Sequence, residues 1–165
     1  MQTSIYPPLS YDQLVSHLDA NVEGLLPNQV IDPSHPEFGG FVGTQDGMAG
    51  GSQFGCVQTI GFAWLTEGSR YYSDPVILDR LRASAVFARS IRRPSGRYDL
   101  ITTNWDCGPY TAFVVQALAP MVAAARRSTQ EGAGEIAEEW GEVIHAAVPG
   151  MVSGGFHTPN HRWVL

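Results

Sequence analysis

The sequence predicts an all-α fold, and three observations support this prediction. Apolar residues recur at helical spacing over most of the 165 residues. Capping signals and loops rich in Gly or Pro separate these segments, and we identify no convincing strand. Apolar residues make up 44% of the chain, which is enough for one core, so we expect a single domain over residues 1–165.

The first helix is predicted over residues 11–26. Ser10 and Gln13 form a capping-box pair at its start, and Pro27 ends its apolar stripe. A long Gly-rich loop then runs to Gly51, and we expect it to be packed because it carries several large apolar residues.

Three further helices follow from similar signals. Ser52 is a candidate cap for a helix over 53–67. Asp74 followed by Pro75 is typical of a helix start, which predicts a helix over 75–91. The segment 105–128 is almost wholly apolar and is predicted to be the fourth helix, with Asn104 as a candidate cap and Pro120 as a candidate kink.

The end of the chain continues this pattern. A fifth helix is predicted over 134–148, and Thr158 followed by Pro159 predicts the start of a sixth at about residue 159. The second, fourth and sixth helices begin about 50 residues apart, which is typical of an array of helical hairpins. The second and fourth are also more apolar all round than the others, so we expect the even-numbered helices to be inner ones, with the loops before them converging on one rim.

Charge limits the classes of partner. The net charge of −6 and the pI of about 5.2 argue against nucleic acid and anionic membranes as partners. The chain has no run of about 18 apolar residues, so we expect no membrane span. The opening residues lack the features of a secretory signal, which leaves a cytoplasmic protein or one whose signal has been removed.

The predicted rim holds the residues best suited to chemistry. If Thr158 caps the sixth helix, Asn160 and His161 lie in its first turn, where free backbone amides favour anions and a neutral imidazole. Arg162 offers a bidentate contact to a carboxylate. The Trp105 and Trp163 rings offer apolar faces for stacking against a sugar.

Metal and cofactor motifs are weak in this sequence. His157 and His161 have the spacing of a shared metal site, but Pro159 lies between them, so we expect them to lie on different faces. His157 is instead a candidate substrate contact. Cys56 and Cys107 have no metal-ligand spacing, and a disulfide between them is possible but not implied. We expect neither a metal nor a cofactor.

Helix pairs, Gly-rich rim loops and the pair Asn160-His161 within GGFHTPNHRW resemble the (α/α)-toroid polysaccharide lyases, the heparinase II/III-like and alginate lyase group. The resemblance implies the N-terminal part of a larger toroid that cleaves an anionic, uronate-containing polysaccharide by β-elimination. Asn160 would neutralise the uronate carboxylate, and His161 would be the base or its partner. A tyrosine protonates the leaving oxygen in such lyases, and Tyr98 and Tyr110 lie near the predicted rim.

Two alternatives stay open. A glycoside hydrolase of the unsaturated-glucuronyl type on the same toroid would use a carboxylate pair, for which Asp46 and Asp106 are the candidates. A non-catalytic helical module would bind a glycan or a protein through Trp105 or Trp163. An incomplete toroid would also leave apolar helix faces uncovered, which predicts self-association.

Overall fold

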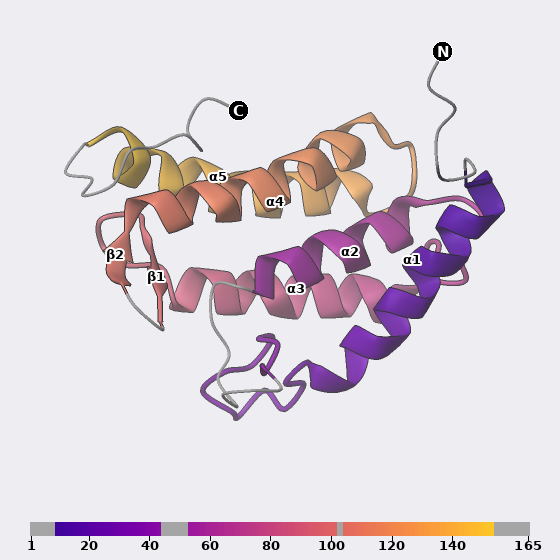
Figure 1. Ribbon diagram of the computed structural model, residues 1–165, viewed down its shortest axis with the longest axis horizontal. Coiled ribbons are helices and arrows are strands. Elements are labelled where there is room, and N and C mark those ends of the chain that lie inside the picture. The colour runs from indigo at the N-terminus through magenta and orange to yellow at the C-terminus, as the bar shows by residue number, and fades with distance from the viewer. Residues whose placement is uncertain (1–8, 44–52, 102–103, 154–165) are drawn as a thin grey trace, which may run out of the picture.

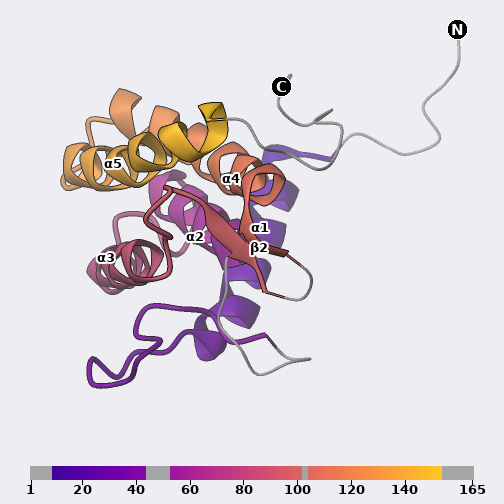
Figure 2. The ribbon, with the colours of Figure 1, turned by 90° about the vertical axis from the view of Figure 1, so that its left-hand side faces the viewer.

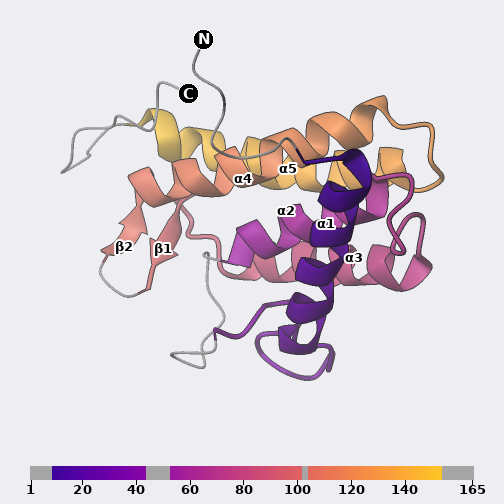
Figure 3. The same ribbon diagram turned by 45° about the vertical axis from the view of Figure 1, so that its right-hand side comes forward.

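The computed structural model describes residues 9–43, 53–101 and 104–153, and four of its helices form two stacked layers (Figures 1 and 2). The helices are α1 (Tyr11–Leu25), α2 (Phe54–Leu65), α3 (Pro75–Ser90), α4 (Gly108–Arg127) and α5 (Ala133–Val152). The pair α4–α5 lies over the pair α2–α3, with α4 against α2 and α5 against α3. α1 packs on α2 and crosses it at a steep angle (Figure 3). The predicted helical character of the chain is thus confirmed.

Local capping explains two of the predicted helix starts. At α1 the Gln13 amide donates to Ser10 Oγ over 3.2 Å, and the Ser10 amide donates to Gln13 Oε1 over 2.8 Å, which completes the capping box. At α3 the Val76 amide donates to Asp74 Oδ1 over 2.8 Å. α1 ends at Leu25, and a short 3₁₀ helix, Leu26–Asn28, follows and contains Pro27.

The described part of the long loop is packed, as predicted. Phe41 is buried, and its amide donates to Gln53 Oε1 over 2.8 Å. Gln29 is also buried, and its Nε2 donates to Ser84 Oγ and to the Arg80 carbonyl on α3 over 2.9 Å each. α2 begins after Gln53, which makes no side-chain cap, and Ser52 lies outside the described residues.

The prediction of no strand is wrong. β1 (Tyr98–Leu100) and β2 (Asn104–Cys107) form a small antiparallel hairpin, with Tyr98 opposite Cys107 and Leu100 opposite Asn104. α4 therefore begins at Gly108 rather than at residue 105, and Asn104 is a strand residue rather than a helix cap. Thr111 on α4 holds the hairpin, because its Oγ1 accepts from the Tyr98 amide and donates to the Cys107 carbonyl.

α5 is longer than predicted, running through Pro149 to Val152 rather than ending at residue 148. The helix continues for three residues after Pro149, and Arg97 Nε donates to the Gly150 carbonyl over 2.7 Å, which satisfies a carbonyl of the last turn. The Ser153 amide donates to the Pro149 carbonyl and closes that turn.

Aromatic side chains fill the core between the layers. Phe54, Tyr98 and Trp140 are buried, and the Phe54 ring meets the other two edge to face at centroid distances of 5.1 and 6.5 Å. α4 is long and apolar enough to cross a membrane by length and composition alone. In this structure it packs against α2 and α5, as the core helix of a folded domain does. The absence of a membrane span remains a prediction from the sequence.

Four helices have one end near the β1–β2 hairpin. α2 and α4 begin at this end, and α3 and α5 run back toward it (Figure 1). The described residues show neither a closed ring nor a repeated unit, so the toroid and its repeat remain predictions. The predicted sixth helix lies outside the described residues.

Candidate functional site

Only two of the predicted site residues fall within the described part of the chain, Trp105 and Asp106, and both lie on β2. Asp106 is therefore not the first-turn helix residue that the sequence predicts. The other predicted site residues lie outside the described ranges: Asp46, His157, Asn160, His161, Arg162 and Trp163.

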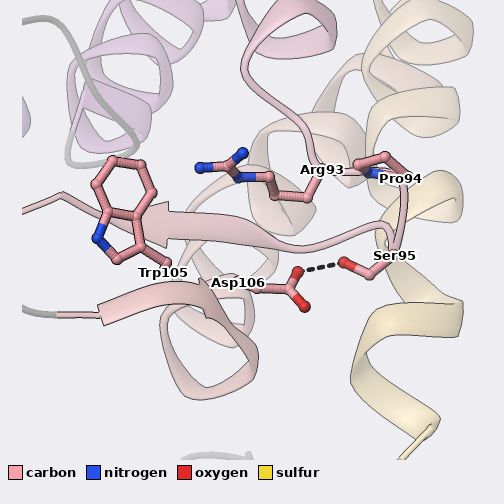
Figure 4. A pocket seen from close by; sticks show the side chains of 5 residues that line it. All are labelled: Arg93, Pro94, Ser95, Trp105 and Asp106. Carbon is pink, nitrogen blue, oxygen red and sulfur yellow. Dashed lines mark hydrogen bonds between the residues drawn. The ribbon is translucent and has the colours of Figure 1, made fainter.

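Trp105 and Asp106 line an open pocket of about 520 Å³, together with Arg93, Pro94 and Ser95 (Figure 4). The loop between α3 and β1 forms one wall, and β2 forms the other. Figure 4 shows the Arg93 side chain extended toward the Trp105 indole, while Asp106 points toward Ser95. The pocket thus combines an aromatic ring with a cation, a carboxylate and a hydroxyl.

The Trp105 indole is an exposed aromatic surface. Its exposed fraction is 69%, whereas Trp64 and Trp140 are buried in the core. The Arg93 guanidinium lies 5.1 Å from the centroid of the Trp105 ring, which is a cation–π contact. An indole held by one neighbour keeps most of its apolar surface in water, where it is free to contact a ligand.

Arg93 is itself held in place. Its Nε lies 3.0 and 2.9 Å from the two Asp99 carboxylate oxygens, and its Nη2 lies 2.5 Å from Asp99 Oδ2. This forked pairing fixes the plane of the guanidinium. The sequence places Arg93 in a charged pair with Arg92 and gives neither Arg93 nor Asp99 a role, because nothing local indicates that the chain folds back between them.

Asp106 adopts a backbone conformation that few residues accept. Its φ is +51°, in the left-handed region, where Asn and Asp are more common than other non-glycine residues. The Asp106 amide donates to Asp99 Oδ1 over 2.7 Å, and Ser95 Oγ donates to Asp106 Oδ1. Arg97 Nη1 lies 3.4 Å from Asp106 Oδ2. These contacts hold the hairpin in the shape that presents Trp105.

Arg97 and two glycines join the pocket loop to the end of α5. Arg97 donates to the Gly150 carbonyl and, over 3.1 Å, to Ser153 Oγ. A Cβ on Gly96 would lie 2.6 Å from the Ala146 carbonyl oxygen, and one on Gly150 would lie 2.8 Å from the Ser95 carbonyl oxygen. The loop before β1 therefore packs with its backbone directly against the last turns of α5.

Asp99 makes stability depend on pH. The hydrogen bond from Arg93, more than any other contact, lowers the pKa of Asp99 below its ordinary value of 3.8. The charged carboxylate therefore stabilises the fold above pH 3.8, and this contribution is lost as the pH falls through that value toward the lower folded pKa.

We predict that Asp99→Asn lowers the free energy of unfolding at neutral pH, and that the difference from the unaltered chain shrinks below pH 3.8. Denaturant titrations of both proteins, at neutral pH and again below pH 3.8, measure the difference in the free energy of unfolding. A difference of the same size at both values would show that the Asp99 charge contributes nothing to the fold.

Tyr98 is unsuited to the role of catalytic acid. Its side chain is buried in the core, and burial raises the pKa of the phenol to about 12. A phenol with no exposed surface cannot reach a bound polysaccharide. Tyr110, the other candidate, lies on α4 and is half-buried.

Within the described ranges, no group of three or more His, Cys, Asp or Glu side chains lies close enough together to hold a metal ion. Cys56 and Cys107 are both free thiols, the first half-buried and the second buried. Burial raises the pKa of the Cys56 thiol.

Comparison with protein-family models, with curated proteins and with solved structures finds no match. Function must therefore be argued from the pocket itself.

Proposed function

We propose that this protein binds a saccharide at the pocket between Arg93 and Trp105. The observation that carries the proposal is the Trp105 indole, exposed over 69% of its surface and fixed beside an open pocket by Arg93. A sugar ring has an apolar face of similar size, and stacking it on the indole would remove apolar surface of both from water.

The polar groups around Trp105 suit the hydroxyls of a sugar. The Arg93 guanidinium offers N–H donors, and the Asp106 carboxylate offers acceptors. Contacts outside the pocket, from Asp99 and Arg97, already hold both groups, so binding requires little ordering of side chains. Such pre-ordering favours affinity at a shallow site.

We predict that Trp105→Ala weakens saccharide binding at least about tenfold, as expected when an anchoring aromatic is lost. Calorimetric titration against a panel of neutral and uronate-containing oligosaccharides measures it. Tyr72→Ala is the matched control and should leave affinity unchanged, because it removes an exposed aromatic ring just before α3, whereas Arg93 follows the other end of that helix. Equal affinities for the unaltered chain and Trp105→Ala would refute the proposal.

Cleavage of a uronate-containing polysaccharide by β-elimination is a second candidate, with Asn160 and His161 in the roles that the lyase resemblance implies. One observation favours it: Ser153, the last described residue, accepts from Arg97 beside the pocket. Asn160 follows seven residues later, and an extended chain of that length spans at most about 25 Å. That length sets only an upper limit on the distance of Asn160 from Ser153, and Asn160 and His161 lie outside the described residues.

The unsaturated bond formed by β-elimination absorbs ultraviolet light, so absorbance during incubation with uronate polysaccharides tests this candidate. A rise that His161→Ala abolishes supports a lyase, whereas binding without any rise leaves a binding module. The hydrolase alternative gains no support from Asp106. Both of its carboxylate oxygens accept hydrogen bonds from the loop before β1, which favours a positioning role over proton transfer.

A further inference from the structure

Two arginines of the described pocket loop, Arg93 and Arg97, each contact a carboxylate. Arg93 is bonded to Asp99, and Arg97 lies against Asp106, so two cations meet two anions. The pairs differ in what they expose: 12% of the Asp99 side chain is exposed, against 46% for Asp106. The anion that a ligand on Trp105 meets is therefore the Asp106 carboxylate.

The open hydrogen-bonding groups on the described pocket side chains include donors on Arg93 and Trp105 and acceptors on Asp106. Arg93 uses Nε and Nη2 on Asp99, and its Nη1 makes no hydrogen bond to the residues that the structure describes. Each Asp106 oxygen accepts one hydrogen bond and keeps a further lone pair. A hydroxyl is both donor and acceptor, so neighbouring sugar hydroxyls can satisfy Arg93 and Asp106 together.

A carboxylate on the ligand fits this arrangement less well. It would meet the exposed Asp106 charge, and like charges at short range repel even in partly exposed sites. To gain full attraction from Arg93 it would also have to compete with Asp99, which already holds the guanidinium by a forked contact. The pocket contains no cation that lacks an anion among its described neighbours.

We infer that the Trp105 pocket selects a neutral sugar unit over an acidic one, and that Asp106 sets this preference. The inference rests on the proposed function and names its ligand class. In a polysaccharide that alternates uronate and neutral units, the pocket takes the neutral unit, and a cleavage site for the uronate would lie beside it.

The test compares each uronate oligosaccharide in a panel with its carboxyl-reduced form, which has the same rings and linkages without the charge. The unaltered full chain should bind the reduced forms more tightly. Asp106→Asn keeps the shape of the side chain and suits the left-handed backbone, because asparagine is enriched there. This variant should reduce the ratio of affinities for the reduced and uronate forms about fivefold, as expected for loss of one partly exposed charge.

Asp79→Asn is the charge-matched control. It removes one exposed carboxylate near the start of α3, whereas Arg93 follows the end of that helix, and it should leave the preference unchanged. Tighter binding of the uronate forms by the unaltered chain would overturn the inference, as would a preference that Asp106→Asn does not alter. Failure to bind any saccharide is a different result and would refute the proposed function itself.

Discussion

Gly39→Ala is expected to destabilise the fold by about 3 kcal/mol, a larger loss of stability than we predict for any other substitution. The loop crosses α3 at this residue with backbone against backbone: a Cβ would lie 1.9 Å from the Ala83 carbonyl oxygen. The φ of Gly39 is also +86°, which costs any residue with a side chain. Its carbonyl accepts from Ser84 Oγ, so the loop cannot move away without breaking that bond.

The midpoint of thermal unfolding should fall by roughly 10 °C for this change. Gly24→Ala is the control, because a Cβ at this position in α1 meets nothing within 4 Å and alanine favours a helix. It should leave stability unchanged or raise it slightly. A stable Gly39→Ala protein would show that the loop does not lie on α3 as described.

Gly96→Ala is expected to damage both stability and binding. Its φ is +88°, and a Cβ would lie 2.6 Å from the Ala146 carbonyl oxygen on α5. Relieving that clash moves the loop off α5 and carries Arg93 and Ser95 with it. We expect a loss of about 2 kcal/mol in the free energy of unfolding. Saccharide affinity should fall too, because Arg93 no longer holds Trp105.

Denaturant unfolding and calorimetric titration of the same protein measure the two effects. Gly134→Ala, at an open position near the start of α5, serves as the control and should affect neither. Lost stability with full affinity would show that the pocket forms without its support from α5. Full stability would show that the loop and α5 are not in direct contact.

Helix starts are predictable where their causes are local. The Ser10–Gln13 capping box and the Asp74-Pro75 start depend on residues within one turn of each other, so the sequence displays them fully. The end of α5 depends on Arg97, more than 50 residues away, and the sequence alone therefore predicts a helix that stops before Pro149.

The hairpin escapes prediction for a related reason. Asn104 and the apolar run that follows it match a capped helix, and only pairing with 98–100 shows otherwise. Pro94-Ser95-Gly96, a turn-forming run before Tyr98, is the signal that could have indicated it. Trp105 can still be chosen from the sequence, because its side-chain chemistry does not depend on the element that carries it. Arg93 lines the pocket and Asp99 holds Arg93 in place, but both roles depend on the chain folding back, which the sequence does not display.

The most direct test of the proposed function is an NMR measurement on the full chain with the tightest-binding oligosaccharide. We predict nuclear Overhauser contacts between protons of a sugar ring and the indole protons of Trp105, assigned by their loss in Trp105→Phe. The buried indoles of Trp64 and Trp140 should show none. Saccharide contacts that avoid Trp105, or binding that leaves its indole signals unshifted, would contradict the account.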